Sequence, residues 1–505
     1  MNRTRRWLLK TGLFGAAAVA SGCNPEVSER EDEEAAPWQP RTQKSRDYQS
    51  LTDGSESIPA DLVAQTWSQP FEPPKSIPAS ADVVIIGGGI LGVSTAWFLT
   101  KQGVDVVLCE KGHIAGEQSG RNWGWVRQQE RDAREMPMMV ESMKIWRALA
   151  DEIGEDVGFQ QTGCIYAARD DDELDGYAAW LPTAQEYGVD TRIISGDELA
   201  RYARGAAGTW KGAMYTASDA RAEPHKAAPA IARAAARNGA TIMTGCAVRG
   251  LETEAGRVSA VVTEHGAIKA PVVLCAAGAW SSIFCQSLGI SLPQTIVRGT
   301  VVRTAPGENV LNGCFWGDTT GIRRRQDGGY TVANSAFLDH PITPSTFRNA
   351  LDFLPAFMQE FENLNLLIGH DFMNEWTTPK QWKLDAESPF EKMRVLNADP
   401  NPQAITGIRE SLQTLFPELA EIKFAEAWAG IIESTPDVVP VIDESEAIPG
   451  FYIATGLSGH GFGIGPGAGK ATAGMLTATD TGMDLSEFRL SRFFDGTEIR
   501  LQQMN

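Results

Sequence analysis

The chain has 505 residues, of which 43% are hydrophobic and 22% charged, a composition typical of globular proteins. This length supports more than one hydrophobic core, because single cores stop growing at roughly 250–300 residues. The formal net charge of −19 argues against binding to nucleic acid or to an anionic lipid surface.

The first 23 residues predict an export signal. Arg5 and Arg6 precede an apolar run over residues 13–20, which is too short for a membrane-spanning helix. The paired arginines resemble a twin-arginine signal, which implies passage through the twin-arginine export machinery. The run ends in the sequence ASGC, which resembles a lipoprotein cleavage box. Acylation of Cys23 would leave a membrane-anchored protein facing the periplasm, and an uncleaved N-terminal anchor is the alternative.

Residues 24–78 are rich in Glu, Pro, Ser and Gln and predict a solvated linker. The cysteines beyond it form no C-x-x-C pair, and we expect buried free thiols rather than disulfides. The histidines show no cluster spacing, so we expect no metal site. These cysteines are Cys109, Cys164, Cys246, Cys275, Cys285 and Cys314.

The folded body begins near Ala81 with a strand, a helix and a second strand. The sequence DVVII at residues 82–86 is typical of a strand buried on both faces of a parallel sheet. We expect a helix from about Ile90 to Gln102 and the second strand over residues 104–109. The segment is therefore a βαβ unit.

The sequence GGGILG joins the first strand to the helix and predicts a dinucleotide site. Gly87 makes the tight turn, Gly89 lets the backbone approach a pyrophosphate, and Gly92 lets the helix pack on the strand. The helix N-terminus, at Ile90, offers amide donors to the phosphates. Glu110 ends the second strand, where it would accept hydrogen bonds from ribose hydroxyls and repel the 2′-phosphate of NADP.

A glycine-rich polar loop soon after Glu110 favours FAD over NAD. Its side chains and amides supply the donors needed to reach the pyrophosphate and the edge of a flavin. The predicted contacts here are Lys111, Gln118, Ser119, Gly120, Arg121 and Asn122.

Together these motifs resemble the amine and amino-acid oxidase family, which includes D-amino-acid oxidase, glycine oxidase, sarcosine oxidase and D-amino-acid dehydrogenase. The sequence VVLCAAGAW at residues 272–280 resembles the family's second flavin-domain signature, and residues 428–462 resemble the C-terminal signature that returns to the flavin ring. The resemblance implies FAD, and the cysteines give no argument for a covalent flavin link, so we expect the FAD to be non-covalent. Its further predicted contacts are Val248, Gly278, Trp280, Gly459, Gly461, Phe462 and Gly463.

Within that family, the chain from about Ala81 onward is similar to the bacterial membrane-associated L-amino-acid deaminases. The similarity is carried by residues 116–121, 246–253, 266–269 and, most specifically, 382–391 in an inserted helical module. It implies oxidation of an L-amino acid to the 2-oxo acid and ammonia. It also implies that the electrons pass to a membrane quinone or another respiratory acceptor rather than to oxygen.

The predicted fold class is α/β with an α+β substrate domain. A Rossmann-like FAD-binding domain interleaves with an antiparallel-sheet substrate domain, because the pattern becomes shorter and alternating around residues 160–220 and 295–340. Further strands are expected at residues 241–243, 258–263, 272–274 and 451–454. We assign residues 79–160, 222–295 and 425–490 to the FAD-binding domain, residues 161–221 and 296–424 to the substrate domain, and residues 345–420 to its helical insertion.

A substrate carboxylate needs a planar cation, which arginine supplies. Residues from Gly321 to Tyr330 predict a strand entering a hairpin, with Arg323 and Arg325 on one face and Arg324 on the other. The resemblance places the family's carboxylate-binding arginine in this stretch. Alignment from Gly321 favours Arg325 and alignment from Tyr330 favours Arg323. We prefer Arg325, because length differences belong in the turn; a solvated basic edge strand is the alternative.

The sequence WGWVRQQ after the flavin loop is a second candidate for substrate contact. Trp125 and its neighbouring tryptophan could wall a substrate pocket, with Arg127 or Gln128 as polar members, whereas packing in the core is the alternative. This stretch is more aromatic than in the deaminases, which leaves the substrate's side chain open. His460, in the glycine-rich return loop, could tune the flavin, contact the substrate or only shape the loop.

These features predict an exported FAD-dependent oxidoreductase that transfers hydride from the Cα of a small amino-acid substrate, of L configuration, to flavin N5. A secondary amine, a D-amino acid or an opine-like compound is the alternative substrate. The remaining alternative is a non-catalytic, nucleotide-binding lipoprotein.

Overall fold

The computed structural model describes residues 71, 76–360 and 364–501. The predicted signal, Cys23 and nearly all of the predicted linker lie outside the described residues, so these assignments stay predictions. Within the described ranges, the helices lack the combination of length and apolar character that a membrane span needs.

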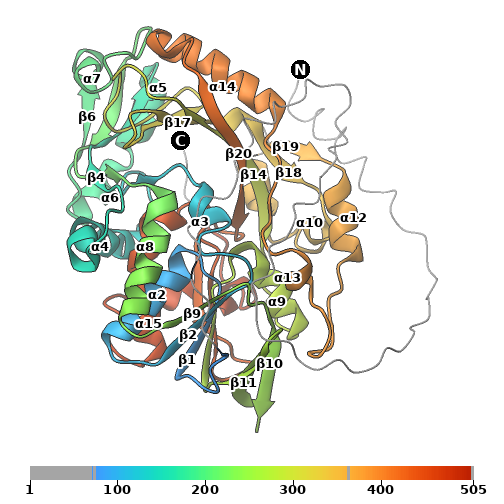
Figure 1. Cartoon of the computed structure of the whole chain (residues 1–505). Helices are drawn as coiled ribbons and strands as arrows, with labels where there is room; N and C mark the ends of the chain where they lie inside the picture. Colours follow the sequence, from blue (N-terminus) through green and yellow to red (C-terminus); the bar gives the residue numbers. More distant parts are fainter. Residues whose placement is uncertain (1–70, 72–75, 361–363, 502–505) are drawn as a thin grey trace. The chain divides into compact units, whose positions relative to one another are not determined.

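A six-stranded sheet forms the lower part of the molecule in Figure 1. The strand order is β21-β22-β13-β1-β2-β9, and every neighbouring pair is parallel except β21 and β22. The predicted βαβ unit and the strands expected at residues 241–243, 272–274 and 451–454 are confirmed. The strands are β1 (Val83–Ile86), β2 (Val106–Glu110), β9 (Thr241–Thr244), β13 (Val272–Cys275), β21 (Val441–Glu444) and β22 (Phe451–Thr455).

Both faces of this sheet are covered, which explains the continuous apolar run of β1. Successive side chains of a strand point to opposite faces. Val83 and Ile85 therefore pack against helices, whereas Val84 and Ile86 pack toward a three-stranded sheet. The helices are α2 (Ile90–Lys101), α4 (Met136–Ile153), α8 (Pro224–Arg237) and α15 (Gly461–Leu476). The strands of the small sheet are β10 (Val248–Glu254), β11 (Arg257–Thr263) and β12 (Gly266–Lys269).

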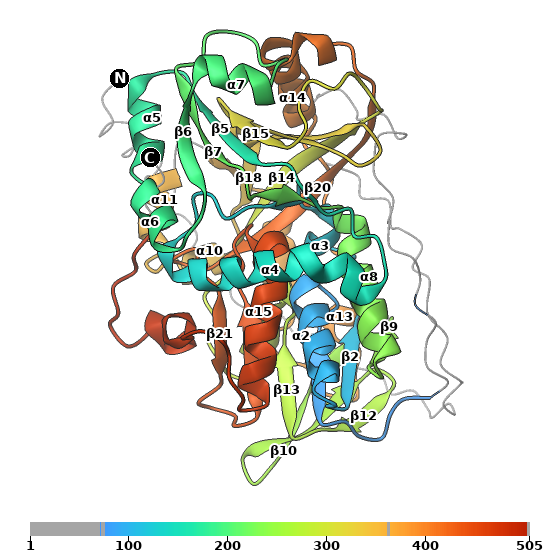
Figure 2. The same ribbon diagram turned by 90° about the vertical axis from the view of Figure 1, so that its left-hand side faces the viewer.

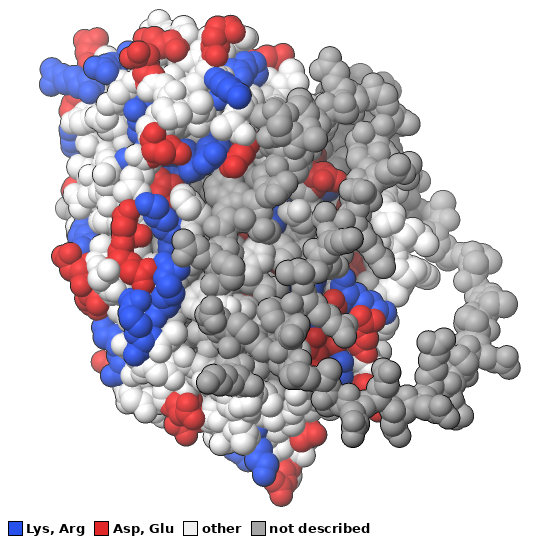
Figure 3. Space-filling view, in the orientation of Figure 1, with Lys and Arg blue, Asp and Glu red and all other residues white. Residues whose placement is uncertain are grey.

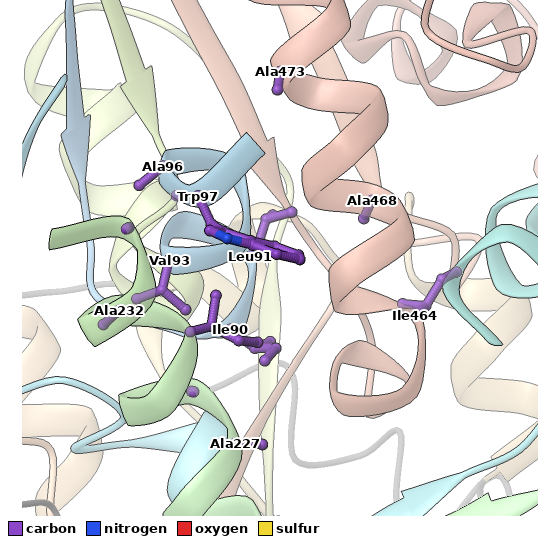
Figure 4. Close-up of a cluster of buried hydrophobic side chains, with 14 of the residues drawn as sticks. Ile90, Leu91, Val93, Ala96, Trp97, Ala227, Ala232, Ile464, Ala468 and Ala473 are labelled. Atoms are coloured by element: carbon purple, nitrogen blue, oxygen red, sulfur yellow. The ribbon is translucent and has the colours of Figure 1, made fainter. Parts of the chain in front are cut away.

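Helices α2 and α15 lie side by side and α4 crosses α15 (Figure 2). Figure 4 shows Ile90, Leu91 and Trp97 of α2 beside Ile464 and Ala468 of α15. The two backbones approach closely because α15 carries small residues, and a Cβ on Gly469 would lie 2.5 Å from the Cβ of Ser94. This contact fixes the start of α15 relative to the glycine turn before α2.

A second, ten-stranded sheet carries the other part of the fold, in the order β19-β18-β14-β17-β16-β15-β5-β7-β6, with β20 paired to β14. Most pairs are antiparallel, as expected. However, β5–β15 and β18–β19 are parallel. The strands are β5 (Cys164–Ala168), β6 (Thr191–Ser195), β7 (Gly212–Thr216), β14 (Thr295–Thr304), β15 (Cys314–Gly317), β16 (Thr320–Arg324), β17 (Tyr330–Asn334), β18 (Leu338–Pro341), β19 (Leu364–Leu367) and β20 (Phe424–Ser434).

The remaining elements are short. A small sheet pairs β3 (Trp125–Val126) and β4 (Gln160–Gln161) with β8 (Ala220–Arg221). The remaining helices outside the insertion are α3 (Gln118–Arg121), α5 (Asp171–Ala178), α6 (Leu181–Glu186), α7 (Gly196–Tyr202) and α9 (Ser281–Ser287).

The predicted helical insertion consists of short helices with extended segments and β19 between them. Its residues 382–391 dock on β10, where Trp382 Nε1 donates to the carbonyl of Arg249 at 2.7 Å and Glu391 pairs with the Arg249 guanidinium at 2.6 Å. Figure 1 shows α10 and α12 near β19. The helices are α10 (Pro344–Arg348), α11 (Leu354–Glu360), α12 (His370–Thr377), α13 (Pro389–Lys392) and α14 (Pro402–Leu415).

On the face of the molecule in Figure 3, Lys and Arg side chains lie among Asp and Glu side chains, with uncharged surface between them. The six cysteines from Cys109 to Cys314 are buried and free, as predicted.

Candidate functional site

A cavity of about 740 Å³ runs from the turn after β1 to the large mixed sheet. Its walls come from the carboxyl ends of β1 and β2, from the loop before α15 and from β20. Ligands of open α/β sheets bind outside the carboxyl ends of the strands. Every residue predicted to contact the cofactor lines this cavity except Gly92 and Gly120. Gly92 packs on the turn instead, where a Cβ would lie 2.1 Å from the carbonyl oxygen of Gly87.

Glu110 is held at one end of the cavity by backbone amides. Its two carboxylate oxygens accept hydrogen bonds from the amides of Gly88 at 2.8 Å and Gly112 at 2.7 Å. Burial raises the pKa of Glu110, against the lowering effect of Lys111 and of these amides. An acceptor in this position matches the requirement of an adenosine ribose.

The first amide of α2 has a partner that the sequence did not indicate. Ile90 N donates to the hydroxyl of Ser119 at 2.8 Å, so this amide is not directed at a phosphate. The Ser119 hydroxyl proton remains available to a ligand. The short helix α3 that carries Ser119 is held by Asn122, whose side-chain amide donates to the carbonyl of Ser119 at 2.8 Å. Asn122 therefore shapes the loop.

A clamp of three residues closes the same end of the cavity. Lys111 Nζ contacts Glu117 at 2.6 Å and lies 4.4 Å from the ring centre of Trp280, whose Nε1 donates to Glu117 at 3.1 Å. Lys111 also donates to the carbonyl of Met393 at 3.0 Å, so the insertion contributes to this wall. The charge of Lys111 is thus paired within the protein.

Five aromatic side chains form a continuous wall at the opposite end. Trp123 stands edge-on to Trp125 at 5.6 Å and stacks on Trp316 at 6.0 Å, and Tyr166 lies 5.8 Å from Tyr177, between ring centres. Pairing of β5 with β15 places Tyr166 directly opposite Trp316. Such a wall excludes water and accepts a bulky apolar group.

Arg127 and Glu130 are the polar groups beside this wall. The Arg127 guanidinium lies 5.7 Å from the ring centre of Tyr166 and uses Nη1 to hold the carbonyls of Gln129 and Glu130. Its other nitrogens make no hydrogen bond within the described ranges. Burial raises the pKa of Glu130 to about 7, against the effect of Arg127, and its backbone is left-handed with φ +54°. Backbone strain of this kind clusters at functional sites.

Gln128 does not line the cavity, contrary to the sequence-based expectation. Its backbone amide and its side chain turn toward Asp219 and Ser218, at 2.6 and 2.9 Å. Burial of Asp219 with these donors leaves Gln128 as a structural support for the loop that presents Arg127.

Arg323 and Arg325 also lie outside the cavity lining. They share one face of the hairpin, as predicted, and that face meets Glu223. Arg323 Nη1 is 3.0 Å and Arg325 Nη2 is 3.9 Å from this carboxylate. Although burial raises the pKa of Glu223, Arg323 and Arg325 hold it at about 2. The Glu223 carboxylate therefore occupies the position in which a substrate carboxylate was expected.

His460 lines the cavity at the start of α15. Its Nδ1 lies 3.0 Å from Glu135 Oε2, and Arg131 Nη1 lies 3.2 Å from the same oxygen. Glu135 and Arg131 are buried. Burial lowers the pKa of His460 and outweighs the opposing effect of Glu135, which favours the neutral imidazole.

The sequence did not reveal several cavity residues. Glu130 and Arg131 follow directly on the WGWVRQQ segment, so adjacency was the available signal. Tyr166 and Trp316 carry no local motif and meet through strand pairing. Glu433, whose pKa burial raises to about 7, accepts a hydrogen bond from Leu457 N at 3.3 Å on the cavity wall.

No group of three or more His, Cys, Asp or Glu side chains in the described part of the chain could hold a metal ion. The cavity combines a glycine turn, a ribose acceptor and a long, mostly apolar channel. These features fit a flavin dinucleotide with a substrate space beyond its ring.

Comparisons with known proteins agree with this geometry. Residues 82–475 match the family described as FAD dependent oxidoreductase. Among solved structures, the chain is similar to L-amino acid deaminase from Proteus myxofaciens in complex with anthranilate, with 32% identity and a TM-score of 0.82, over 86% of this chain and 98% of that one. It is also similar to L-amino acid deaminase from Proteus vulgaris, with 30% identity and a TM-score of 0.80, over 84% of this chain and 99% of that one.

Among curated proteins, mitochondrial sarcosine dehydrogenase of Mus musculus is 25% identical over 95% of this chain and 47% of its own length. The chain thus spans about half the length of this relative.

Proposed function

The chain belongs to the family of FAD-dependent oxidoreductases, and we propose that it acts on an L-amino acid, which it converts to the 2-oxo acid and ammonia. The supporting observation is the single cavity that joins the glycine turn and Glu110 to the aromatic wall and Arg127. One cavity therefore holds both the dinucleotide and a small zwitterion.

Bound FAD supplies the acceptor for the hydride. The protein supplies position and charge. Arg127 binds the substrate carboxylate through its remaining donors, which are the planar pair that such a group prefers. Trp125, Tyr166 and their neighbours receive the side chain and exclude water. The similar deaminase from Proteus myxofaciens is in complex with anthranilate, a molecule with an aromatic ring and a carboxylate, which suits the same pair of features.

Anaerobic mixing of the purified flavoprotein with single amino acids tests this proposal. We expect L-amino acids with large side chains to bleach the flavin absorbance and to yield the matching 2-oxo acid. Their D-enantiomers serve as controls of equal size and charge. Reduction by D-amino acids or secondary amines, with none by L-amino acids, would contradict it.

Oxidation of a secondary amine is the second candidate, because the similarity to sarcosine dehydrogenase covers nearly the whole chain. In that case N-methylated amino acids reduce the flavin faster than the primary amines from which they derive.

We further propose that the enzyme works at a periplasmic membrane surface and passes its electrons to a quinone. The predicted acylation of Cys23 supports this location. A second support is an apolar surface on the insertion, which consists of Phe347, Leu351, Leu354, Met358, Leu367, Ile368, Met373 and Trp376. Of the large hydrophobic side chains that are exposed in the described ranges, only Phe494 lies elsewhere. Quinone reduction without formation of peroxide is the expected result with the purified, substrate-fed enzyme.

A further inference from the structure

A buried carboxylate fixes the ring of His460 at the cavity wall. Glu135 has no exposed surface, whereas the side chain of His460 is 19% exposed. The hydrogen bond between Nδ1 and Glu135 Oε2 occupies one ring nitrogen. The Arg131 guanidinium bonds to Glu135 and also to the carbonyl of His460, at 3.4 Å, so both the ring and its backbone are held.

The hydrogen bond determines which nitrogen carries the proton. Because Glu135 is ionised, Nδ1 must donate to it, and the neutral ring then keeps its lone pair on Nε2. An imidazole with a fixed carboxylate on one nitrogen and a free lone pair on the other is the arrangement of a general base. Glu135 also stabilises the imidazolium that forms when Nε2 takes a proton.

We propose that His460 accepts a proton from the substrate ammonium group and that Glu135 is the positioning residue that holds its ring for this step. The inference rests on the proposed function, because an amine must be neutral before its Cα gives up a hydride. The N–H bond of the ammonium group breaks, Nε2–H forms, and the imidazolium passes the proton to water. FAD is the oxidant of the step that follows.

Three charged groups face His460 and set its titration. Glu135 lies at the start of α4, and Arg127 and Arg131 lie in the loop after β3. The carboxylate raises the pKa of His460, while burial and the two arginines lower it. Removal of the carboxylate must therefore lower this pKa further and weaken the base.

The substitutions His460→Asn and Glu135→Gln test the proposal in the flavin-loaded enzyme. In His460→Asn, flavin reduction at pH 7 should be at least about 10²-fold slower, the lower range of general-base effects. The rate should recover about tenfold per pH unit as solution deprotonates the amine. The control is Glu141→Gln in α4, the helix that begins directly after Glu135. The Glu141 carboxylate pairs with Lys470 of α15 on the exposed side. Its rate profile should match that of the wild type.

Titration of ring-labelled histidine by NMR supplies a readout independent of turnover. The signal lost in His460→Asn identifies the residue. In Glu135→Gln its pKa should fall, whereas in Glu141→Gln it should stay unchanged. The FAD content of each variant reports an intact fold.

The outcomes distinguish a failure of the proposed function from a failure of His460 as the base. If no amine reduces the wild-type flavin, the proposed function fails and the base fails with it. If the wild type is reduced but His460→Asn slows the reaction equally at every pH, only the base is overturned. An unchanged His460 titration in Glu135→Gln overturns the positioning role.

Discussion

The arginines considered for binding a substrate carboxylate differ in what already neutralises them. Arg323 and Arg325 meet the Glu223 carboxylate directly, and their side chains are only 1% and 4% exposed. Arg127 instead holds backbone carbonyls, which carry no net charge. Glu130 and Asp219 interact with Arg127 electrostatically, but neither carboxylate forms an ion pair with it in the described ranges. A substrate carboxylate gains more from such a cation, so the geometry favours Arg127 over the arginines of the hairpin.

Replacement of Arg127 with Met should raise KM by about 10- to 100-fold, the value of one or two hydrogen bonds to a charged group. The flavin spectrum should persist, because Arg127 lies at the aromatic end of the cavity. Steady-state kinetics with the best amino acid measures this effect. An unchanged KM would remove Arg127 from carboxylate binding.

Replacement of Arg323 with Met is the matched comparison and should act on folding. It leaves the buried Glu223 carboxylate with fewer cations, and removal of one partner from a buried pair costs about 3–5 kcal/mol. Denaturant unfolding should show the lower stability. A raised KM with unchanged stability would restore the hairpin arginine as the substrate ligand.

Glu130 should make substrate binding depend on pH. Its pKa is raised to about 7, so the side chain is largely neutral below that pH and becomes a carboxylate above it. The charged form competes with the substrate carboxylate for Arg127, so KM should rise as pH increases through about 7. Glu130→Gln should make KM independent of pH in this range, whereas Glu186→Gln, on the exposed surface of α6, should follow the wild type.

Packing of α2 against α15 links the two signatures that approach the flavin. The glycine turn precedes α2, and the return loop with His460 precedes α15. Because the two helices touch where Gly469 meets Ser94, their N-termini are held in one relative position. The parallel sheet beneath them anchors α2 through Val83 and Ile85.

A methyl group at this contact should separate the helices. In Gly469→Ala the new Cβ would lie 2.5 Å from the Cβ of Ser94, and overpacking of this kind costs about 1–3 kcal/mol. We expect a lower midpoint of denaturant unfolding and weaker FAD retention. Gly369→Ala is the control, since a Cβ there has no neighbour within 4 Å. Equal stability of the two variants would contradict the role of the contact.

At the scale of the whole molecule, the insertion contacts the flavin domain and also exposes apolar side chains. Met393 closes the dinucleotide end of the cavity through Lys111, and Trp382 docks on β10. The insertion also carries the apolar surface, on which Ile368 is 71% and Trp376 65% exposed. The same module therefore joins the flavin domain to the surface proposed to meet the membrane.

The double variant Ile368→Ser and Trp376→Ser tests that surface. Co-sedimentation with vesicles of neutral phospholipid should decrease, because two large apolar side chains no longer leave water. Anaerobic reduction of the flavin by a soluble amino acid should not change. Phe494→Ser removes an exposed aromatic side chain outside the insertion and should leave vesicle binding unaltered. Equal binding of all three proteins would exclude the surface from membrane contact.

Local patterns by themselves determined the dinucleotide-binding half of this protein. The apolar strand, the glycine turn and Glu110 lie within one βαβ unit, where neighbours in sequence are neighbours in space. All but two of the predicted cofactor contacts line one cavity. The sequence also predicted that Arg323 and Arg325 share one face, because side chains two residues apart on a strand point to the same side.

Only the tertiary structure decided which of these groups face the substrate space. Glu223 lies 100 residues from Arg323 in the chain and removes it from the cavity, and Glu135 lies 325 residues from His460 and fixes its ring. Tyr166 and Trp316 meet because β5 and β15 pair in parallel. Such partners depend on how distant segments fold against each other, and buried charges act according to the partner that folding brings to them.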